Sequence, residues 1–272
     1  MADRSASQAF YVRDGSAFAA TELTRGPWDR DSQHAGPPCA LLGRALDLAG
    51  KLEPAQLVRV TYEILRPVPI ARLETRAAIV RPGRSVEMIE GALSHDGADV
   101  IHARAWRIRT AELDLDVDPP ELDPIAEPDS LAEPDGARVK EFFPVGWEVG
   151  YHTAMDVRFL TGGFTEPGPA QAWMRMRVPL IDGEKVAQRD RVLVAADSGN
   201  GVSSPLDYRR WLFINTDLTV NLRRLPEGDW VCLDAVTYAD GHGIGLSDTL
   251  LRDERGMIGR ATQALLVAPR PS

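Results

Sequence analysis

Hydrophobic and polar residues alternate along residues 256–267, which predicts a β-strand near the end of the chain. The alternation places Ala261, Gln263, Leu265 and Val267 on one face of that strand. Gln263 therefore shares a face with apolar neighbours. An unpaired buried amide costs roughly 1–3 kcal/mol, so we expect Gln263 to satisfy the backbone of a neighbouring element or to belong to a polar site in the core.

The first half of the chain predicts a hairpin, one helix and four strands, in that order. Residues 10–12 and 17–23 flank an Asp14-Gly15 turn, and residues 39–49 have helical spacing and are apolar around most of the helix. The four strands are predicted at residues 56–66, 73–80, 85–94 and 99–109. A hairpin, a buried helix and a meander of antiparallel strands is the order of a hotdog fold, in the α+β class.

Residues 111–140 interrupt this pattern and are predicted to be a linker. Between residues 111 and 137 there are ten acidic residues, five prolines and no Lys or Arg. Prolines interrupt helices and ladders, and like charges extend a chain. These ten acids outnumber the formal net charge of −9, so the rest of the chain is near neutral and the acidity indicates nothing about a ligand.

After the linker the same order of elements returns. Strands are predicted at 147–159 and 171–179, a helix at 185–196, and four strands at 213–223, 230–238, 244–251 and 257–267. The sequence thus predicts a double hotdog, with an N-terminal domain at 1–110 and a C-terminal domain at 141–272. We expect each sheet to wrap its own helix and the two domains to pair as a pseudo-dimer.

A common shift of 157 residues relates the two halves, since it joins Leu65-Arg66 to Leu222-Arg223. The same shift places Val60 on Asp217, Val80 on Thr237 and Trp106 on Gln263. Three apolar positions of the first half would then be polar in the second. This asymmetry predicts one working site, in or beside the second domain, and one retired site.

Several motifs resemble those of the double-hotdog acyl-CoA thioesterases of type II. The segments that carry the resemblance lie at residues 33–42, 81–87, 196–201, 217–220, 228–230 and 259–263. In that family an Asp, a Thr or Ser and a Gln hold the attacking water. The resemblance implies that these roles fall on Asp217, Thr237 and Gln263. This chain has Leu218-Thr219 and Ala264-Leu265 where the family usually has His-Ser and Glu-Gly.

Hydrolysis of a fatty-acyl or related thioester by water needs a proton acceptor, a donor that positions the water, and N–H groups for the oxyanion. We assign these first two roles to Asp217 and to Thr237 with Gln263, while the helix N-terminus near Gly36 or near Lys185 supplies the N–H groups. No covalent nucleophile is required, and the chain has no Gly-x-Ser-x-Gly elbow. The expected substrate-binding residues are His34, Gly36, Asp197 and Asn200.

Other interpretations stay open at this stage. Alternation alone favours a solvent-facing Asp217, beside Thr219 and Asn221. The chain could be a non-catalytic protein that binds acyl-CoA or a fatty-acyl group. Asp29 and His34 have the Asp-x4-His spacing that resembles hotdog enoyl-CoA hydratases, in which a carboxylate and an imidazole add water across a double bond.

Composition limits the classes of partner that we expect for this protein. No basic run indicates nucleic acid, and no window approaches 18 apolar residues, so we expect a soluble cytoplasmic protein without a membrane partner. Cys39 and Cys232 have no ligand spacing and are expected to be structural thiols. We expect no metal and no cofactor. The resemblance implies an acyl-CoA substrate and a homo-oligomer.

Overall fold

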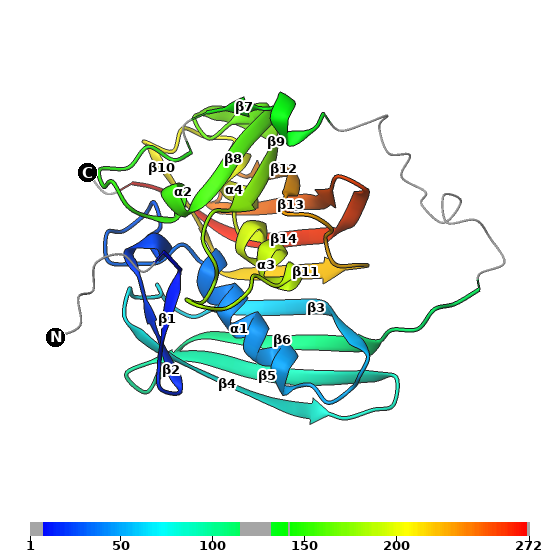
Figure 1. Cartoon of the computed structure of the whole chain (residues 1–272). Coiled ribbons are helices and arrows are strands. Elements are labelled where there is room, and N and C mark those ends of the chain that lie inside the picture. The colour runs from blue at the N-terminus through cyan, green and yellow to red at the C-terminus, as the bar shows by residue number, and fades with distance from the viewer. Residues whose placement is uncertain (1–7, 115–131, 141, 271–272) are drawn as a thin grey trace.

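The computed structural model describes residues 8–114, 132–140 and 142–270. The first half follows the predicted order closely (Figure 1). Its elements are β1 Tyr11–Asp14, β2 Ala17–Ala20, the short 3-10 helix η1 Glu22–Thr24, α1 Gly36–Ala49, β3 Ala55–Ile64, β4 Arg72–Arg81, β5 Val86–His95 and β6 Ala98–Arg109. The hairpin and the single long helix are confirmed, but the predicted four-strand meander is only partly right. Strands β4, β5 and β6 follow one another in the sheet, whereas β3 pairs β6 and not β4.

The second half repeats that order with two departures from prediction. Its elements are the 3-10 helix η3 Pro134–Gly136, β7 Arg138–Val139, α2 Tyr151–Ala154, β8 Met155–Gly163, β9 Glu166–Met176, α3 Gln188–Ala196, α4 Gly199–Val202, β10 Trp211–Asn215, β11 Asp217–Leu222, β12 Val231–Ala239, β13 Ile244–Asp253 and β14 Gly256–Pro269. The strand predicted at 147–159 is replaced by α2 followed by β8. The strand predicted at 213–223 is divided into β10 and β11.

The strand order in the sheet repeats between the two halves. The order is β1-β2-β4-β5-β6-β3-β11-β14-β13-β12-β9-β8-β7, with β10 pairing β14. With the two-residue end strand β7 set aside, β1, β2, β4, β5, β6 and β3 match β8, β9, β12, β13, β14 and β11. The halves join where β3 pairs β11, with Val60 opposite Val220. One antiparallel sheet therefore runs through both halves.

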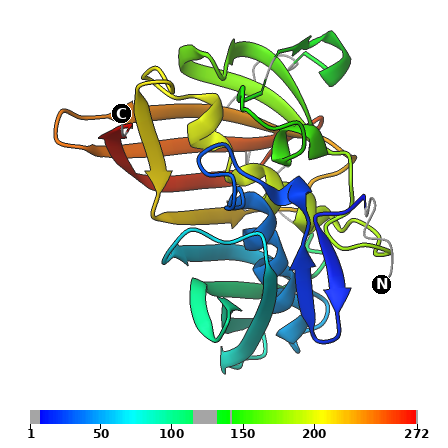
Figure 2. The ribbon, with the colours of Figure 1, turned by 90° about the vertical axis from the view of Figure 1, so that its left-hand side faces the viewer.

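Helices α1 and α3 pack against each other inside the curve of the sheet. Figure 2 shows the hairpin β1–β2 and the strands β8 and β9 coming round the helices from the side opposite the central strands. Glycines allow the close helix contact, because a Cβ on Gly36 would lie 2.3 Å from the carbonyl oxygen of Val194 and one on Gly43 would lie 2.5 Å from Leu193. The end of each helix is thereby held beside the start of the other.

A bulge between β10 and β11 changes which residues face the core. Asn215 pairs with Leu265, but Thr219 pairs with Thr262, so β10–β11 holds one more residue than β14 across this stretch. An extra residue reverses the alternation of faces. Phe213 points inward before the bulge, and Leu218 points inward after it.

The uniform shift of 157 residues is wrong in register. Arg107 pairs with Glu87 in the first half, and Gln263 pairs with Ser247 in the matching position of the second half. Gln263 therefore matches Arg107, 156 residues away, and not Trp106, whose side chain lies on the opposite face of β6. Bulges in several strands make the offset vary from strand to strand, and an error of one residue exchanges the two faces.

Part of the predicted linker, residues 115–131, lies outside the described residues. Its last residues pack on the second half: the indole N–H of Trp173 donates to the carbonyl oxygen of Ala132, and Arg158 forms an ion pair with Asp135. Both cysteines are buried free thiols. Among the described residues, no helix is long and apolar enough to cross a membrane.

Candidate active site

Asp197 lies immediately after α3 and is 4% exposed. One carboxylate oxygen, Oδ1, accepts hydrogen bonds from the side-chain amides of Asn215 (2.9 Å) and Gln263 (3.1 Å). The backbone amides of Ala35 and Gly36, where α1 begins, also donate to this carboxylate. The end of α3, the start of α1 and two strands thus converge on one buried acid.

Burial raises the pKa of Asp197 to about 7, and the four amide groups that donate to it only partly offset that rise. The second oxygen, Oδ2, lies 3.2 Å from Nδ1 of His34. Burial lowers the pKa of His34 to about 3, so its ring is neutral. Because Nδ1 accepts the Gly36 amide at 3.1 Å, a proton shared between His34 and Asp197 must come from the carboxyl group.

Gln263 fulfils the expectation of a buried amide with partners. It is 1% exposed, and its Nε2 donates to both the carbonyl oxygen and Oδ1 of Asp197. Its Oε1 accepts the backbone amide of Asn200 at 3.2 Å. The Asn200 side chain donates to the carbonyl oxygen of Phe213. Gln263 therefore links Asp197 to Asn200 in α4, a helix that begins at Gly199, two residues after Asp197.

A row of hydroxyl groups continues from Gln263 across the sheet. Ser247 pairs with Gln263, and Thr237 pairs with Ser247, so the three residues share the inner face of β12, β13 and β14. Thr237 Oγ1 lies 2.8 Å from Oγ of Ser203. Ser247 Oγ is buried and has no hydrogen-bond partner among the described residues. The row lies under α4, since a Cβ on Gly199 would lie 3.3 Å from Ser247 Oγ.

Asp217 lies on the other face of the sheet from Gln263. Its Oδ1 accepts the backbone amide of Ala264 at 2.8 Å, directly at the bulge between β10 and β11. The carboxylate thereby satisfies an amide beside the irregular pairing. The structure does not bring Asp217 to Gln263; Asp197 occupies that place.

Two further predicted residues can be located. Asp29 is exposed and its Oδ1 accepts the backbone amide of Asp31, so it does not form the predicted carboxylate and imidazole pair with His34. His34 pairs with Asp197 instead. Gly36 lies at the start of α1 with no room for a side chain, and its amide faces both His34 and Asp197.

An aromatic wall adjoins His34. Its ring stacks on Tyr151 at 3.8 Å between centroids, and the Phe143 ring lies nearly parallel to both, with its centroid 6.2 Å from each. The Tyr151 hydroxyl donates to the carbonyl oxygen of Val194 in α3. Phe143 has a φ of +29°, a conformation that costs a bulky residue on the order of 1–3 kcal/mol and that concentrates at functional sites.

The first half holds a second buried polar cluster in the matching position. Arg107, 3% exposed, donates to Asp47 near the end of α1 at 2.8 Å and to Glu87 at 2.5 Å. Arg189, in the first turn of α3, also forms an ion pair with Asp47. Gly50 leaves room for the Arg107 guanidinium, because a Cβ there would overlap it. We call this set the Asp47 cluster, and the set around Asp197 the Asp197 cluster.

Sequence reasoning missed Asn215, Tyr151 and Phe143. The apolar residues Phe213, Leu218 and Val220 change from odd to even positions, and this change was a visible signal of the bulge that leaves Asn215 facing inward and Asp217 facing outward. Tyr151 lies in the stretch predicted to be a strand, which the structure replaces with α2, and Phe143 lies before it; no sequence signal identified either residue. Among the described residues, no group of three or more His, Cys, Asp or Glu side chains could hold a metal ion.

Solved structures share this architecture across nearly the whole chain. A hotdog-fold protein of unknown function from Alicyclobacillus acidocaldarius has a TM-score of 0.71 at 16% identity, with 96% of each chain covered. A putative thioesterase II from Thermobifida fusca has a TM-score of 0.70 at 18% identity, covering 97% of this chain and 98% of its own. An acyl-CoA thioesterase II from Mycobacterium marinum has a TM-score of 0.65 at 16% identity, with 94% of each chain covered.

These likenesses establish the hotdog fold. A comparison with curated proteins finds no match. Models of a protein family match both halves of the sequence: the acyl-CoA thioesterase N-terminal domain over residues 24–108, and the acyl-CoA thioesterase C-terminal domain over residues 122–267. The chain therefore belongs to the acyl-CoA thioesterase family and is a thioester hydrolase.

Proposed function

We propose that this chain hydrolyses a fatty-acyl or related acyl-CoA thioester by direct attack of water, with Asp197 as the general base. The observation that carries the proposal is a buried carboxyl group, with a pKa of about 7, held beside Gln263 and the first amides of α1. A base whose pKa lies near the working pH is present in its ionised form and is still basic enough to accept a proton.

The proposed step conserves every proton. Asp197 accepts a proton from water as the water oxygen attacks the carbonyl carbon, and the partial positive charge at the start of α1 stabilises the oxyanion. The carbon–sulfur bond then breaks, and the leaving thiolate takes the proton from Asp197. Gln263 and Asn215 keep Asp197 oriented throughout. In this scheme Asp197 takes the role first assigned to Asp217.

The proposal extends to the arrangement of the halves. We describe them as two hotdog domains paired as a pseudo-dimer, so that α1 of one domain completes a site whose acid follows α3 of the other. The matching strand orders support this description. Boundaries at residues 1–110 and 141–272, and association of further copies into an oligomer, stay predictions.

The test compares two acids. Thiol release from acyl-CoA substrates of increasing chain length is measured for the native chain, Asp197→Asn and Asp217→Asn. We expect Asp197→Asn to lower kcat about 10²–10⁴-fold, as loss of a general base does. The native kcat/KM should rise with pH until about pH 7 and then level off, since the ionised carboxyl group is the active form.

Asp217→Asn is the matched control, because it makes the same change on the other face of the sheet. We expect it to lower thermal stability and to keep most of the activity. Collapse of activity in Asp217→Asn, with Asp197→Asn active, would return the base to Asp217. Tight acyl-CoA binding with no turnover by the native chain would contradict the hydrolytic scheme.

A further inference from the structure

A pocket of about 340 Å³ lies on the outer side of the aromatic wall. Phe143 lines it and also stacks against both Tyr151 and His34. Phe164 and Tyr208 continue the aromatic lining, with 5.1 Å between their ring centroids. The pocket therefore reaches Phe143, which stacks against His34, and His34 contacts Asp197.

Two arginines give this pocket a positive charge. Arg209 and Arg270 are among its lining residues, which include no Asp or Glu in the described part of the chain. The Arg270 guanidinium lies 5.1 Å from the centre of the Trp28 ring and donates from Nε to the carbonyl oxygen of Tyr208. These contacts fix its position at the pocket wall. Asp207, next in the chain to Tyr208, accepts the backbone amide of Arg209.

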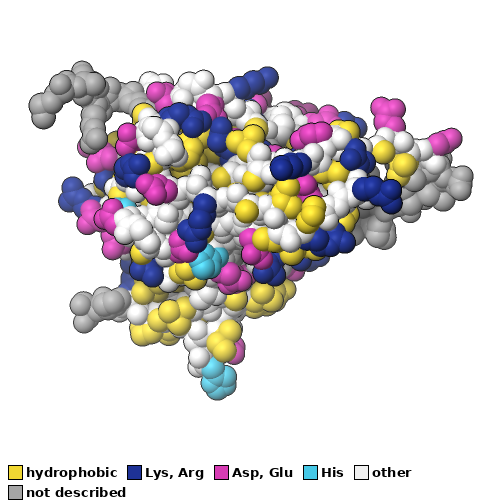
Figure 3. All heavy atoms as spheres, turned by 90° about the horizontal axis from the view of Figure 1, so that it is seen from below, with side chains coloured by type: hydrophobic (Ala, Val, Ile, Leu, Met, Phe, Trp, Pro, Cys, Tyr) yellow, Lys and Arg dark blue, Asp and Glu magenta, His cyan; other side chains and the backbone are white. Residues whose placement is uncertain are grey.

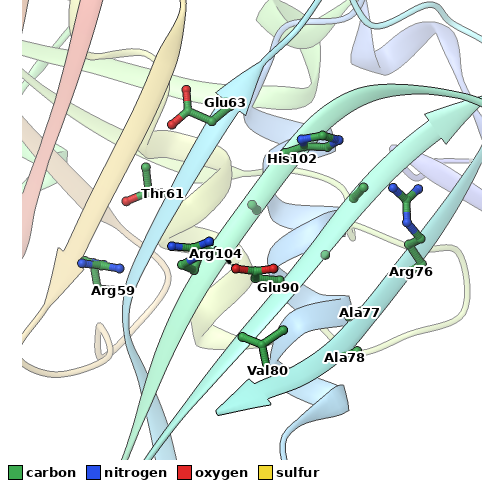
Figure 4. Close-up of a pocket in the computed structure, with 13 residues that line it drawn as sticks. Arg59, Thr61, Glu63, Arg76, Ala77, Ala78, Val80, Glu90, His102 and Arg104 are labelled. Atoms are coloured by element: carbon green, nitrogen blue, oxygen red, sulfur yellow. Dashed lines mark ion pairs between the residues drawn. The ribbon is translucent and has the colours of Figure 1, made fainter.

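A larger groove elsewhere is a poorer match for an anion that must reach Asp197. It has a volume of about 690 Å³ and lies on the outer face of β3, β4, β5 and β6 (Figure 4). Acidic as well as basic side chains line it, among them Glu90 and Arg104, which form an ion pair. Seen from below, the surface of the molecule also has basic and acidic side chains interspersed (Figure 3). The sheet separates the groove from α1, which packs on the inner face.

We propose that the aromatic pocket takes the phosphorylated end of acyl-CoA, with Arg209 and Arg270 binding its phosphate groups and the pantetheine arm passing Phe143 towards Asp197. The proposal rests on the proposed function, which places the reacting carbonyl at Asp197. Guanidinium groups bind phosphate oxygens through charge-assisted, often paired, hydrogen bonds. The ring faces suit the uncharged arm, because pockets for such ligands are mostly apolar with a few fixed polar groups.

The experiment separates recognition of the CoA end from the chemistry. Octanoyl-CoA and octanoyl-N-acetylcysteamine carry the same acyl group, but only the first carries phosphates. We expect the variant Arg209→Gln/Arg270→Gln to lower the ratio of kcat/KM for the CoA ester to that for the short ester by at least about tenfold per arginine. The control, Arg104→Gln, removes one arginine from the groove and should leave the ratio as in the native chain.

Binding of CoA itself, measured by calorimetry, keeps this test independent of turnover. Weaker CoA binding in the double variant supports the pocket even where no chain hydrolyses either ester. Equal CoA binding by the native chain and the double variant overturns the proposal, as does a loss confined to Arg104→Gln. Thermal unfolding of each variant checks the fold, and Arg270→Lys, which keeps the charge, should recover part of the binding.

Discussion

The Asp197 and Asp47 clusters occupy the same place in the two halves of the molecule and differ in charge. Each acid lies near the end of its helix and faces the start of the other helix. Asp47 meets two guanidinium groups, those of Arg107 and Arg189. Asp197 meets only neutral groups, the amides at the start of α1, Asn215 and Gln263. The matching positions Arg107 and Gln263 account for much of this difference.

This comparison teaches how two halves with matching strand orders can hold buried acids in different charge environments. In the Asp47 cluster, Arg107 and two backbone amides hold the pKa of Glu87 below its usual value, so this carboxylate is a poor proton acceptor. A buried carboxyl group surrounded by amides keeps a pKa near neutrality and can exchange a proton there. The Asp47 cluster therefore fits a structural role that joins α1, α3 and β6, and the Asp197 cluster fits a catalytic one.

The largest effect should come from removing Arg107. Arg107→Met leaves Glu87 buried without its charge partner, which costs about 3–5 kcal/mol of unfolding free energy. Gln263→Met, the matched change in the other cluster, leaves the Asn200 amide unpaired and costs about 1–3 kcal/mol. We expect activity per folded molecule to fall in Gln263→Met only. Urea unfolding measures the loss of stability in each variant, and initial rates measure its activity. A loss of activity in Arg107→Met but not in Gln263→Met would contradict the two assigned roles.

The clusters should also respond to pH with opposite signs. Asp197 has a folded-state pKa raised from 3.8 to about 7, so its stabilising contribution is complete below about pH 4 and is lost as pH rises through 7. This difference in pKa corresponds to on the order of 4 kcal/mol. Asp197→Asn should flatten the dependence of the unfolding free energy on pH between pH 4 and pH 7, as measured by chemical unfolding. An unchanged slope would show that Asp197 ionises normally.

Glu87 should give the opposite trend. Burial acts to raise its pKa, but the amides of Leu52 and Lys51 together with Arg107 outweigh that effect and hold the pKa below its usual value. Its contribution is therefore present above the pKa of the unfolded chain and is lost as pH falls through the folded-state value. Glu87→Gln should reduce the loss of unfolding free energy on acidification. It should leave the pH dependence of that free energy near neutral pH unaltered.

The smallest effect is expected from the aromatic wall. Tyr151→Phe keeps the stacking on His34 and removes the hydrogen bond to the Val194 carbonyl oxygen, which costs about 0.5–1.5 kcal/mol. We expect kcat to fall by less than about tenfold, since Tyr151 supports His34 and does not contact Asp197 in the described contacts. A loss as large as that of Asp197→Asn would place Tyr151 among the reacting groups.

Local pattern predicted most of the elements. Alternation placed Gln263 on an inward face, and helical spacing with Pro37, Pro38 and Gly50 placed α1 within a few residues. These features depend on neighbours two to four positions away, so they are readable from the chain alone. The segment before β8 was misread because α2 is a single turn, too short to produce a period.

The sequence by itself determined that a polar residue would be buried on the last strand. It could not determine which acid would meet that residue, because Asp217 and Asp197 are both compatible with the local pattern. The tertiary structure decided it in favour of Asp197, which lies 66 residues from Gln263 and reaches it only because α3 packs against α1 under the sheet. The bulge beside Asp217 completes the selection, since one extra residue exchanges the inward and outward faces of a strand.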